Sequence, residues 1–495
     1  MAAEPEHRLY RFDPADTSGV FLGLGLGQCV AVGSGLTASV LALSAGLALP
    51  LAALPAAGGA AVSFARLGGR PLWGWLALLW AWGSLRVGRG RRWVAPLALL
   101  PDDEGRPLAL PPCLAGLSVL DLPWRGRQRL GAVRDDQAHT LTAVVRVAGP
   151  AFVVQPRAEQ ERLVAGWGDV LNGFATEGGP VSHLSWSDLA APSGLEAHRA
   201  WLDSLEAGEV NAEARASYDE LLATATATAA AHDVVVSVTV ARSRLGRSAG
   251  DDPEAALARA LASSLEALLR AAHSAGLEVA GPLGAAELQR VLRTRCDPAL
   301  ARPAVVGGRL VDRLGLVGRG DAGPMAVEAS WAQVRIDAAV HRTYKVVAWP
   351  RLPVPPGWLE PFLAGPGVTR TMTVVFCPVS AYQSRRRIER DLVKLESDAT
   401  TKQDKGRRVD ARHRRATQAL LDREAELVAG YAEVAYLGLV GVSAASEEAL
   451  AEACEVTEQA AREVGMELRC LEARQDLAWA SALPFGLAPR HLLAG

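Results

Sequence analysis

The residues that could carry chemistry in this sequence are few and scattered. Asp135, Asp136 and His139 cluster in a polar turn, and His183 begins a short apolar run that ends at Trp186. The run 341–345 (HRTYK) places histidine, arginine, tyrosine and lysine on one predicted strand. A solvated turn, a histidine satisfied at the edge of the core and a half-exposed strand explain these three sets better than catalysis or anion binding does.

The motifs that identify enzymes are missing. A phosphate-binding P-loop needs GxxxxGK[ST], and the sequence contains no Gly-Lys pair. It also contains no HExxH, no GxSxG and no kinase signature set. The six cysteines are scattered without a CxxC pair, as is typical of free thiols in a reducing compartment rather than of a zinc or disulfide framework. We therefore predict a protein that is not an enzyme, with no catalytic residues, cofactor or metal.

Arginine-rich segments raise the question of nucleic-acid binding. Residues 381–430 hold 13 Arg or Lys and 9 Asp or Glu, including the runs 385–387 and 407–415. Because acidic residues interleave with the basic ones at helical spacing, the pattern favours two solvated, antiparallel helices that break near Gly406. A net charge of −2 excludes a polycation overall. Direct nucleic-acid contact is therefore not expected.

Charge is distributed unevenly along the chain. Residues 17–65 contain no Asp, Glu, Lys, Arg or His, a run of 49 uncharged residues. One membrane helix needs about 20 apolar residues, so this run has room for two spans, near 20–42 and 45–65. A secretory signal is shorter and carries its basic residues before the apolar part, whereas here the strongly basic segment follows it. We therefore predict a transmembrane hairpin at 19–66 after a cytoplasmic lead at 1–18.

The basic residues around the hairpin predict its orientation. Arg8 and Arg11 precede it, the turn between the spans is uncharged, and 66–93 contains six arginines and no acidic residue. By the positive-inside rule, both termini lie in the cytoplasm and the protein is a multi-pass protein of the cell (inner) membrane.

Two local patterns predict how these segments pack. Small residues repeat every four positions along the first span and would form a helix-packing face, comprising Gly19, Gly23, Gly27, Ala31 and Gly35. The segment 67–93 then carries tryptophans followed by arginines, which is typical of a helix at the interface with anionic lipid. The interface residues are Trp73, Trp75, Trp80, Trp82, Arg86, Arg89, Arg91 and Arg92.

The rest of the chain predicts a cytoplasmic mixed α/β (α+β) body. A proline-rich linker at 94–112 leads to an α/β region at 113–345 and a second at 346–495, the latter interrupted by the charged helical insertion 381–430. The runs 130–149 predict a β-hairpin, 156–177 and 252–274 predict helices, and 233–241 predicts a strand. The strand–helix–strand pattern of 433–473 is typical of a split βαβ unit, and two related halves are possible.

Several segments together resemble parts of conjugative type IV secretion systems. They are RLYRFDPAD (8–16), the hairpin, RGRRW (89–93), LPPCLAGLSVLDLPW (110–124), GAVRDDQAHTLTAVVRVAG (131–149) and 158–186. The chain is similar to an actinobacterial family in which a PrgI-type hairpin subunit is fused to the amino-terminal, non-ATPase domain of TrbE/TraC-type conjugation ATPases. In that domain FVVQP (152–156) and HLSW (183–186) would be matching strands. The ATPase module has no counterpart here, because there is no P-loop.

The resemblance implies a structural, ATPase-docking subunit of a conjugation machine. Its partners would be a separate secretion or coupling ATPase, other membrane subunits, anionic lipid and further copies of itself. Two alternatives stay open: a membrane subunit of type VII secretion, and a membrane-anchored enzyme of unknown chemistry, which would need a deep pocket with convergent polar groups.

Overall fold

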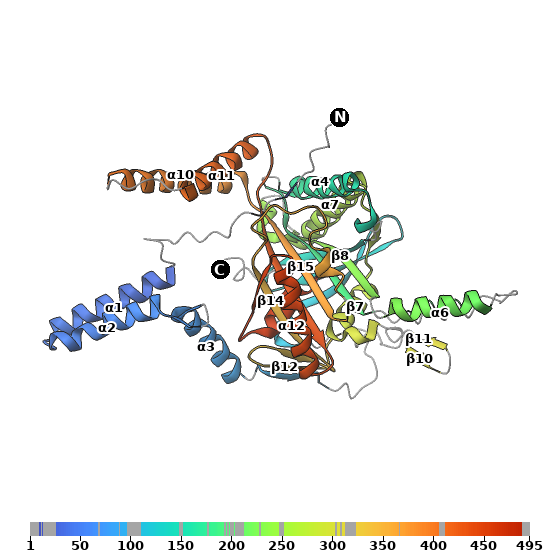
Figure 1. The fold of residues 1–495 in the computed structure, drawn as a ribbon, viewed down its shortest axis with the longest axis horizontal. Helices are drawn as coiled ribbons and strands as arrows, with labels where there is room; N and C mark the ends of the chain where they lie inside the picture. Colours follow the sequence, from blue (N-terminus) through green and yellow to red (C-terminus); the bar gives the residue numbers. More distant parts are fainter. Residues whose placement is uncertain are drawn as a thin grey trace.

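A computed structural model gives the arrangement of the chain (Figure 1). It describes residues 9–10, 12, 26–67, 70–88, 90–96, 110–147, 152–175, 178–192, 195, 198, 202, 212–226, 229–246, 252–301, 304–306, 309–311, 323–365, 367–404 and 411–487. The expected mixed α/β class is confirmed, and its centre is one large antiparallel sheet.

The amino-terminal part consists of three helices and three short strands. They are α1 (Leu26–Ser44), α2 (Leu49–Phe64), β1 (Arg66–Leu67), β2 (Arg70–Pro71), α3 (Leu72–Val87) and β3 (Arg92–Val94). The α1–α2 hairpin extends away from the body, and α3 connects it to the sheet (Figure 1). Gly46 ends α1 with a φ of 80°, and the Leu47 amide bonds back to the Ala42 carbonyl, the six-to-one bond of a glycine-terminated helix.

The body begins with a unit in which two strands precede the order βαββαβ, one helix is inserted before the third strand of that order, and a further helix follows it. It comprises β4 (Leu117–Pro123), β5 (Arg129–Asp135), β6 (Thr140–Val147), α4 (Arg157–Phe174), β7 (Val181–Pro192), α6 (Ala212–Thr226), β8 (Ala230–Ala241), α7 (Pro253–Ser274), β9 (Val279–Pro282) and α8 (Ala285–Cys296). A small hairpin follows, β10 (Ala304–Val306) and β11 (Arg309–Val311). The predicted hairpin, helices and strand are all present, and Asp252 caps α7 by accepting from the Glu254 and Ala255 amides.

A second unit repeats this order. It comprises β12 (Ala326–Ala329), β13 (Val334–Ile336), β14 (Ala339–Ala348), α9 (Glu360–Leu363), β15 (Thr369–Pro378), α10 (Ala381–Asp404), α11 (Ala411–Val428), β16 (Val434–Ala444), α12 (Glu447–Glu463), β17 (Glu467–Cys470) and α13 (Gln475–Ala482). The expected division at residue 345 falls inside β14. The structural boundary therefore lies earlier, before β12.

The two units are related by a pseudo-twofold axis. Each has the ferredoxin-like strand order, β9-β6-β8-β7 in the first and β17-β14-β16-β15 in the second, and they join where β7 pairs with β15. Ser187 pairs with Val235 of β8 as Thr373 pairs with Leu439 of β16, so the two residues hold equivalent places. They also pair with each other, and Thr373 Oγ1 donates to Ser187 Oγ at 3.0 Å. The axis therefore passes between them.

Helices cover both faces of the joined sheet. On one face α4 and α7 pack on the first unit, and α9 and α12 on the second. On the other face α8 and α13 cover a shared core that includes Val144, Ile336 and Trp479. The insertions, α6 in one unit and α10–α11 in the other, leave the body on opposite sides (Figure 1).

Candidate membrane anchor and its seat on the sheet

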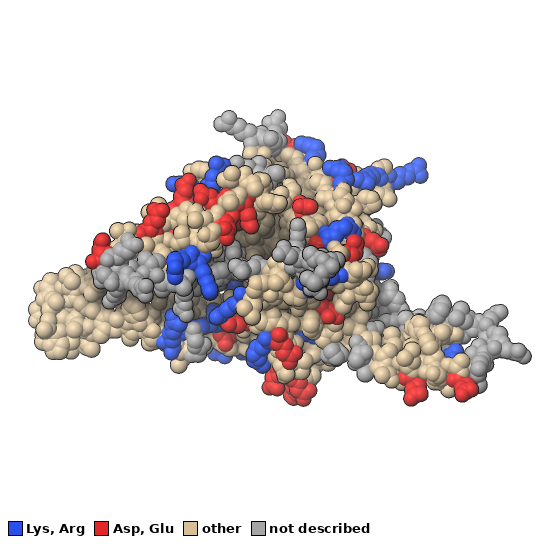
Figure 2. All heavy atoms as spheres, turned by 45° about the horizontal axis from the view of Figure 1, so that its top comes forward, with Lys and Arg blue, Asp and Glu red and all other residues tan. Residues whose placement is uncertain are grey.

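The hairpin presents an apolar surface without charge. In Figure 2 its lobe, at the left, shows neither blue nor red. Large side chains along it are exposed, among them Val40, Leu41, Leu49 and Leu54, at 61–71 %. Of the helices in the described ranges, α1 is the one long and apolar enough to span a membrane, and α2, with 16 residues, is shorter.

Polar side chains in the hairpin are satisfied within it. Gln28 Nε2 donates to the Ser63 carbonyl at 2.8 Å, and Ser63 Oγ donates to the carbonyls of Gln28 and Gly59. Ser39 Oγ accepts from the Ala56 amide at 2.9 Å. Hydroxyls on α1 bond back to carbonyls of their own helix at Ser34, Thr37 and Ser44. A helix pair in lipid needs this property, because lipid offers its polar groups no partner.

Small residues allow α1 and α2 to touch backbone to backbone. A Cβ on Gly35 would lie 2.6 Å from the Pro55 carbonyl oxygen, and one on Gly59 would lie 2.5 Å from that of Ala31. Gly27, the third described member of the predicted face, lies against Trp73 of α3. Gly19 and Gly23 lie outside the described residues. The predicted face thus contacts both α2 and α3.

The helix α3, which follows the hairpin, packs on the second unit through tryptophan contacts. Trp331, in the turn between β12 and β13, stacks on Trp75 with ring centroids 6.4 Å apart and an angle of 1°. It also meets Trp82 edge to face at 5.7 Å and 85°. Trp80, by contrast, is 82 % exposed, and Arg86 lies over the Trp82 ring. Two of the four tryptophans expected at the lipid interface therefore contact the body.

Arginines near α3 also bind the body. Arg70 pairs with Glu472 at 2.7 Å, and its guanidinium donates to the Cys470 carbonyl. Arg91 and Arg92 both pair with Glu328, at 3.5 and 2.8 Å. β3 adds to the sheet beside β12, which is why these two arginines meet an acidic partner. Arg91 and Arg92 therefore help to fix β3 beside β12. Their contact with lipid headgroups stays a prediction, and Arg89 lies outside the described residues.

The incoming end of the hairpin is fastened to the same unit. Tyr10 and Val354 exchange two backbone hydrogen bonds of 2.9 Å. Phe12 stacks on Trp349 at 5.3 Å and meets the edges of Trp358 and Tyr436 at 5.3 and 6.3 Å. We call these three rings the aromatic cage. Trp349 can lie flat on β16 because residue 438 is glycine, where a Cβ would come within 2.7 Å of the indole.

The polar residues considered for chemistry have structural partners. Asp135 Oδ1 accepts from the amides of Gln137 and Ala138, which forms the turn, and Asp136 pairs with Arg134. His139 has a φ of 52° in that turn. His183 Nδ1 lies 3.0 Å from Ser182 Oγ. These contacts fix the β5–β6 turn and the start of β7.

The run 341–345 is likewise divided among separate structural contacts. His341 is buried between Ser443 Oγ on Nδ1 and the Cys296 carbonyl on Nε2, and burial lowers its pKa to about 4. Arg342 donates to the Ala332 carbonyl, and Tyr344 donates to Glu458. These contacts hold β14 against α8, the β12–β13 turn and α12.

The arginine-rich insertion has its own ion pairs. Arg387 of α10 and Arg423 of α11 both pair with Glu433 just before β16, so one acidic residue ties the two helices to the start of a strand. Arg386 stacks on Tyr382 one turn earlier, with the guanidinium carbon 5.5 Å from the ring centroid.

Burial also governs the cysteine thiols. Burial raises the pKa of Cys113 and of Cys470 to about 12, so both are neutral near pH 7. Neutral thiols are poor nucleophiles and poor metal ligands. The described residues hold no cluster of three or more histidine, cysteine or acidic side chains placed to bind a metal.

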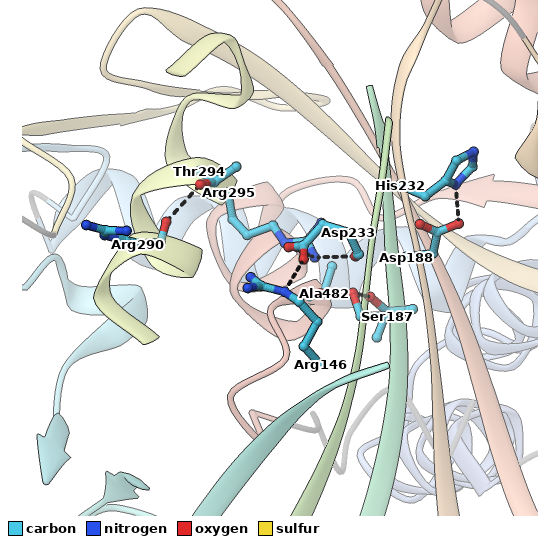
Figure 3. Close-up of polar contacts among 10 residues, drawn as sticks. Arg146, Ser187, Asp188, His232, Asp233, Arg290, Thr294, Arg295 and Ala482 are labelled. Carbon is cyan, nitrogen blue, oxygen red and sulfur yellow. Dashed lines mark hydrogen bonds and ion pairs between the residues drawn. The ribbon is translucent and has the colours of Figure 1, made fainter. Parts of the chain in front are cut away.

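A buried ionic cluster lies between α8 and the sheet, and the sequence patterns gave no sign of it. Arg295 of α8 donates to the Asp233 carbonyl at 3.4 Å and lies 3.5 Å from its carboxylate, which also accepts from Arg146 Nε at 3.1 Å (Figure 3). Burial lowers the pKa of Arg295. Its Nε and Nη1, with Thr343 Oγ1, have no hydrogen-bond partner in the described chain. Arg295 and Thr343 line a cavity of about 20 Å³, which has room for a water molecule but not for an organic substrate.

A histidine–aspartate pair was also missed by the sequence analysis. Asp188 is buried, and its Oδ2 lies 2.9 Å from His232 Nδ1, whose pKa is raised by that hydrogen bond (Figure 3). The only sequence signal was a polar residue at an inward position of a strand. The pair has the orienting half of a hydrolytic triad, but no described hydroxyl or thiol lies within hydrogen-bond distance of His232 Nε2.

No family model matches the chain, and no curated protein matches it significantly.

Proposed function

We propose that this protein is a membrane-anchored, non-enzymatic docking subunit of a conjugation or secretion machine, with the α1–α2 hairpin in the cell membrane and the double sheet in the cytoplasm. One observation carries the anchor: both ends of an uncharged hairpin are fastened to the same body. Phe12 binds the aromatic cage before the first helix, and Trp331 binds α3 after the second.

This arrangement favours two spans over one. A single span would place the lead and the body on opposite sides of the bilayer, whereas the docking of Phe12 on Trp349 supports the same side for both. A signal sequence would not need polar groups matched between two helices, as Gln28 and Ser63 are. At 1.5 Å per residue α2 measures about 24 Å against a hydrocarbon core of about 30 Å, and local thinning of the bilayer accommodates such a mismatch at modest cost.

The docking role rests on the resemblance and on the shape of the body. The sequence lacks the P-loop that a motor needs, so energy would have to come from a separate ATPase. Two helical insertions extend from opposite sides of the sheet and offer surface to partners (Figure 1).

The anchor is tested by topology mapping in intact cells. Single cysteines are introduced at Ala3, in the lead, and at Ala45, in the hairpin turn, in a chain whose six native cysteines are replaced by serine or alanine. A membrane-impermeant maleimide should label the turn from outside and the lead only after lysis. Labelling of the lead from outside, or release of the protein by alkaline carbonate, would contradict the anchor.

The docking role is tested separately by purification from native membranes in mild detergent, followed by mass spectrometry. We expect a P-loop ATPase to accompany the protein, and its type distinguishes conjugation from type VII secretion. A folded, abundant preparation without any ATPase would refute the docking role and leave the anchor intact.

A further inference from the structure

The two outer edges of the sheet differ in what covers them. In the second unit β3 pairs with the outer edge of β12, so residues 92–94 close that side. In the first unit β4 is the last strand, and no other described strand pairs with its outer edge. β4 has seven residues, whereas β3, the outermost strand at the other end of the sheet, has three and includes Arg92. A long edge strand with few charges is a template for a further strand.

The registers show that β4 and β12 hold equivalent places. Leu117 pairs with Asp135, the last residue of β5, and Val327 pairs with Ile336, the last residue of β13. Leu117 of β4 is therefore equivalent to Val327 of β12, and the next residue along each strand makes Ser118 equivalent to Glu328. The outer edge of β4 is therefore the counterpart of the edge that β3 fills.

β3 shows what this place accepts. The Ala329 amide donates to the Arg91 carbonyl and the Ala95 amide to the Met325 carbonyl, both at 2.8 Å. Trp93 lies opposite Val327 and packs against the core beneath α8 and α13. Arg92 lies opposite Glu328 and pairs with it. Main-chain bonds, one aromatic ring and one ion pair hold the strand.

Unused groups line the equivalent edge in the first unit. Ser118 Oγ is buried without a hydrogen-bond partner in the described chain. Leu120 and Leu122 are half buried against the first core, and Val119 is 36 % exposed. Asp121 is exposed as well, and its carboxylate pairs with Arg129 of the neighbouring strand β5 at 3.0 Å. An added strand would bury the leucines further, and a donor opposite Ser118 would satisfy its hydroxyl.

We propose that β4 binds an extended segment of a partner protein by strand addition, and that this segment carries a basic residue followed by an aromatic and an aliphatic one, the order found in β3. Main-chain hydrogen bonds would supply affinity, and the alternate side chains would supply selectivity. The proposal deepens the docking role and rests on it, because it names the kind of segment that docks.

A peptide with the sequence of residues 89–96 (RGRRWVAP) is the probe. It is added to the full-length protein in neutral detergent, and hydrogen–deuterium exchange is followed in 117–123. We expect slower exchange there, with no change in 326–329 and none with a scrambled peptide. Unchanged exchange in 117–123 at saturating peptide, or protection of 326–329 by displacement of β3, would overturn the proposal.

The side-chain argument has its own variants. Ser118→Glu recreates the acidic residue at the place of Glu328 and should tighten peptide binding by about two- to five-fold, as an exposed ion pair does. Ser118→Lys should weaken binding by a similar factor. Equal binding by both variants would refute the assigned register. Neither measurement depends on insertion of the hairpin into a membrane, so a failure here is distinct from a failure of the anchor.

Discussion

Replacing Trp331 by alanine should release α3 from the body. Trp331 makes one stacked contact, with Trp75, and one edge-to-face contact, with Trp82. An aromatic pair contributes about 0.5–1.5 kcal/mol beyond its buried area, so the two pairs together contribute about 1–3 kcal/mol. The equilibrium between docked and released α3 should therefore shift by about 5- to 150-fold, since 1.4 kcal/mol corresponds to a factor of about ten.

Limited proteolysis measures this shift. When opening and closing are fast relative to cleavage, the cleavage rate follows the population of the open state. Trypsin should then cut after Arg86 about 5- to 150-fold faster in Trp331→Ala than in the unchanged protein in detergent. Trp80→Ala is the matched control, because Trp80 is 82 % exposed, and it should leave the rate unchanged. Equal rates for the two variants would show that the tryptophan contacts do not hold α3.

Three further changes test the interior and the hairpin. The pKa of His341 is about 4 in the folded protein and about 6.5 in the unfolded chain, so the neutral imidazole favours folding. This contribution to the free energy of unfolding, about 3 kcal/mol, is fully present above pH 6.5 and is lost as the pH falls to 4. His341→Gln should remove that part of the pH dependence of unfolding. Gly59→Leu forces a side chain against the Ala31 carbonyl and should cost about 1–3 kcal/mol in detergent unfolding, whereas Gly58→Leu, which meets open space, should cost little. Phe12→Ala should speed proteolysis of the lead, and an unchanged rate would argue against the aromatic cage as its seat.

Local patterns predicted most elements of the fold. The α7 helix was expected at 252–274 and runs from 253 to 274, because its apolar residues recur at helical spacing behind an aspartate cap. The strand 233–241 was expected from alternation and β-branched residues, and β8 covers it. The two insertion helices predicted within 381–430 are present as α10, which ends at 404, and α11, which begins at 411, and Gly406, where the break was predicted, lies outside the described residues.

Long-range pairing could not be predicted in this way. Arg92 and Glu328 are 236 residues apart, and nothing near either residue signals the other. The same holds for Phe12 with its cage and for Trp75 with Trp331. A tryptophan that packs a helix against protein and one that packs it against lipid can lie in the same local sequence. For that reason Trp75 and Trp82 were both assigned to the lipid interface. The duplication was hidden because strand register, not residue identity, is what the two units share.

That duplication gives the two units different tasks. Three residues beyond the central pair of Ser187 and Thr373, Ala190 lies beside His232 in the first unit and Phe376 beside Tyr436 in the second. In the second unit Tyr436, at this position, contacts Phe12, and the outer edge of β12 pairs with β3. The amino-terminal part of the chain therefore occupies both of these sites. In the first unit the same two places hold the His232–Asp188 pair and the outer edge of β4. In this duplicated fold one copy holds the chain's own amino-terminal part, and the equivalent surfaces of the other copy are the ones that we propose partners use. The peptide experiment on β4 asks whether one of them is used.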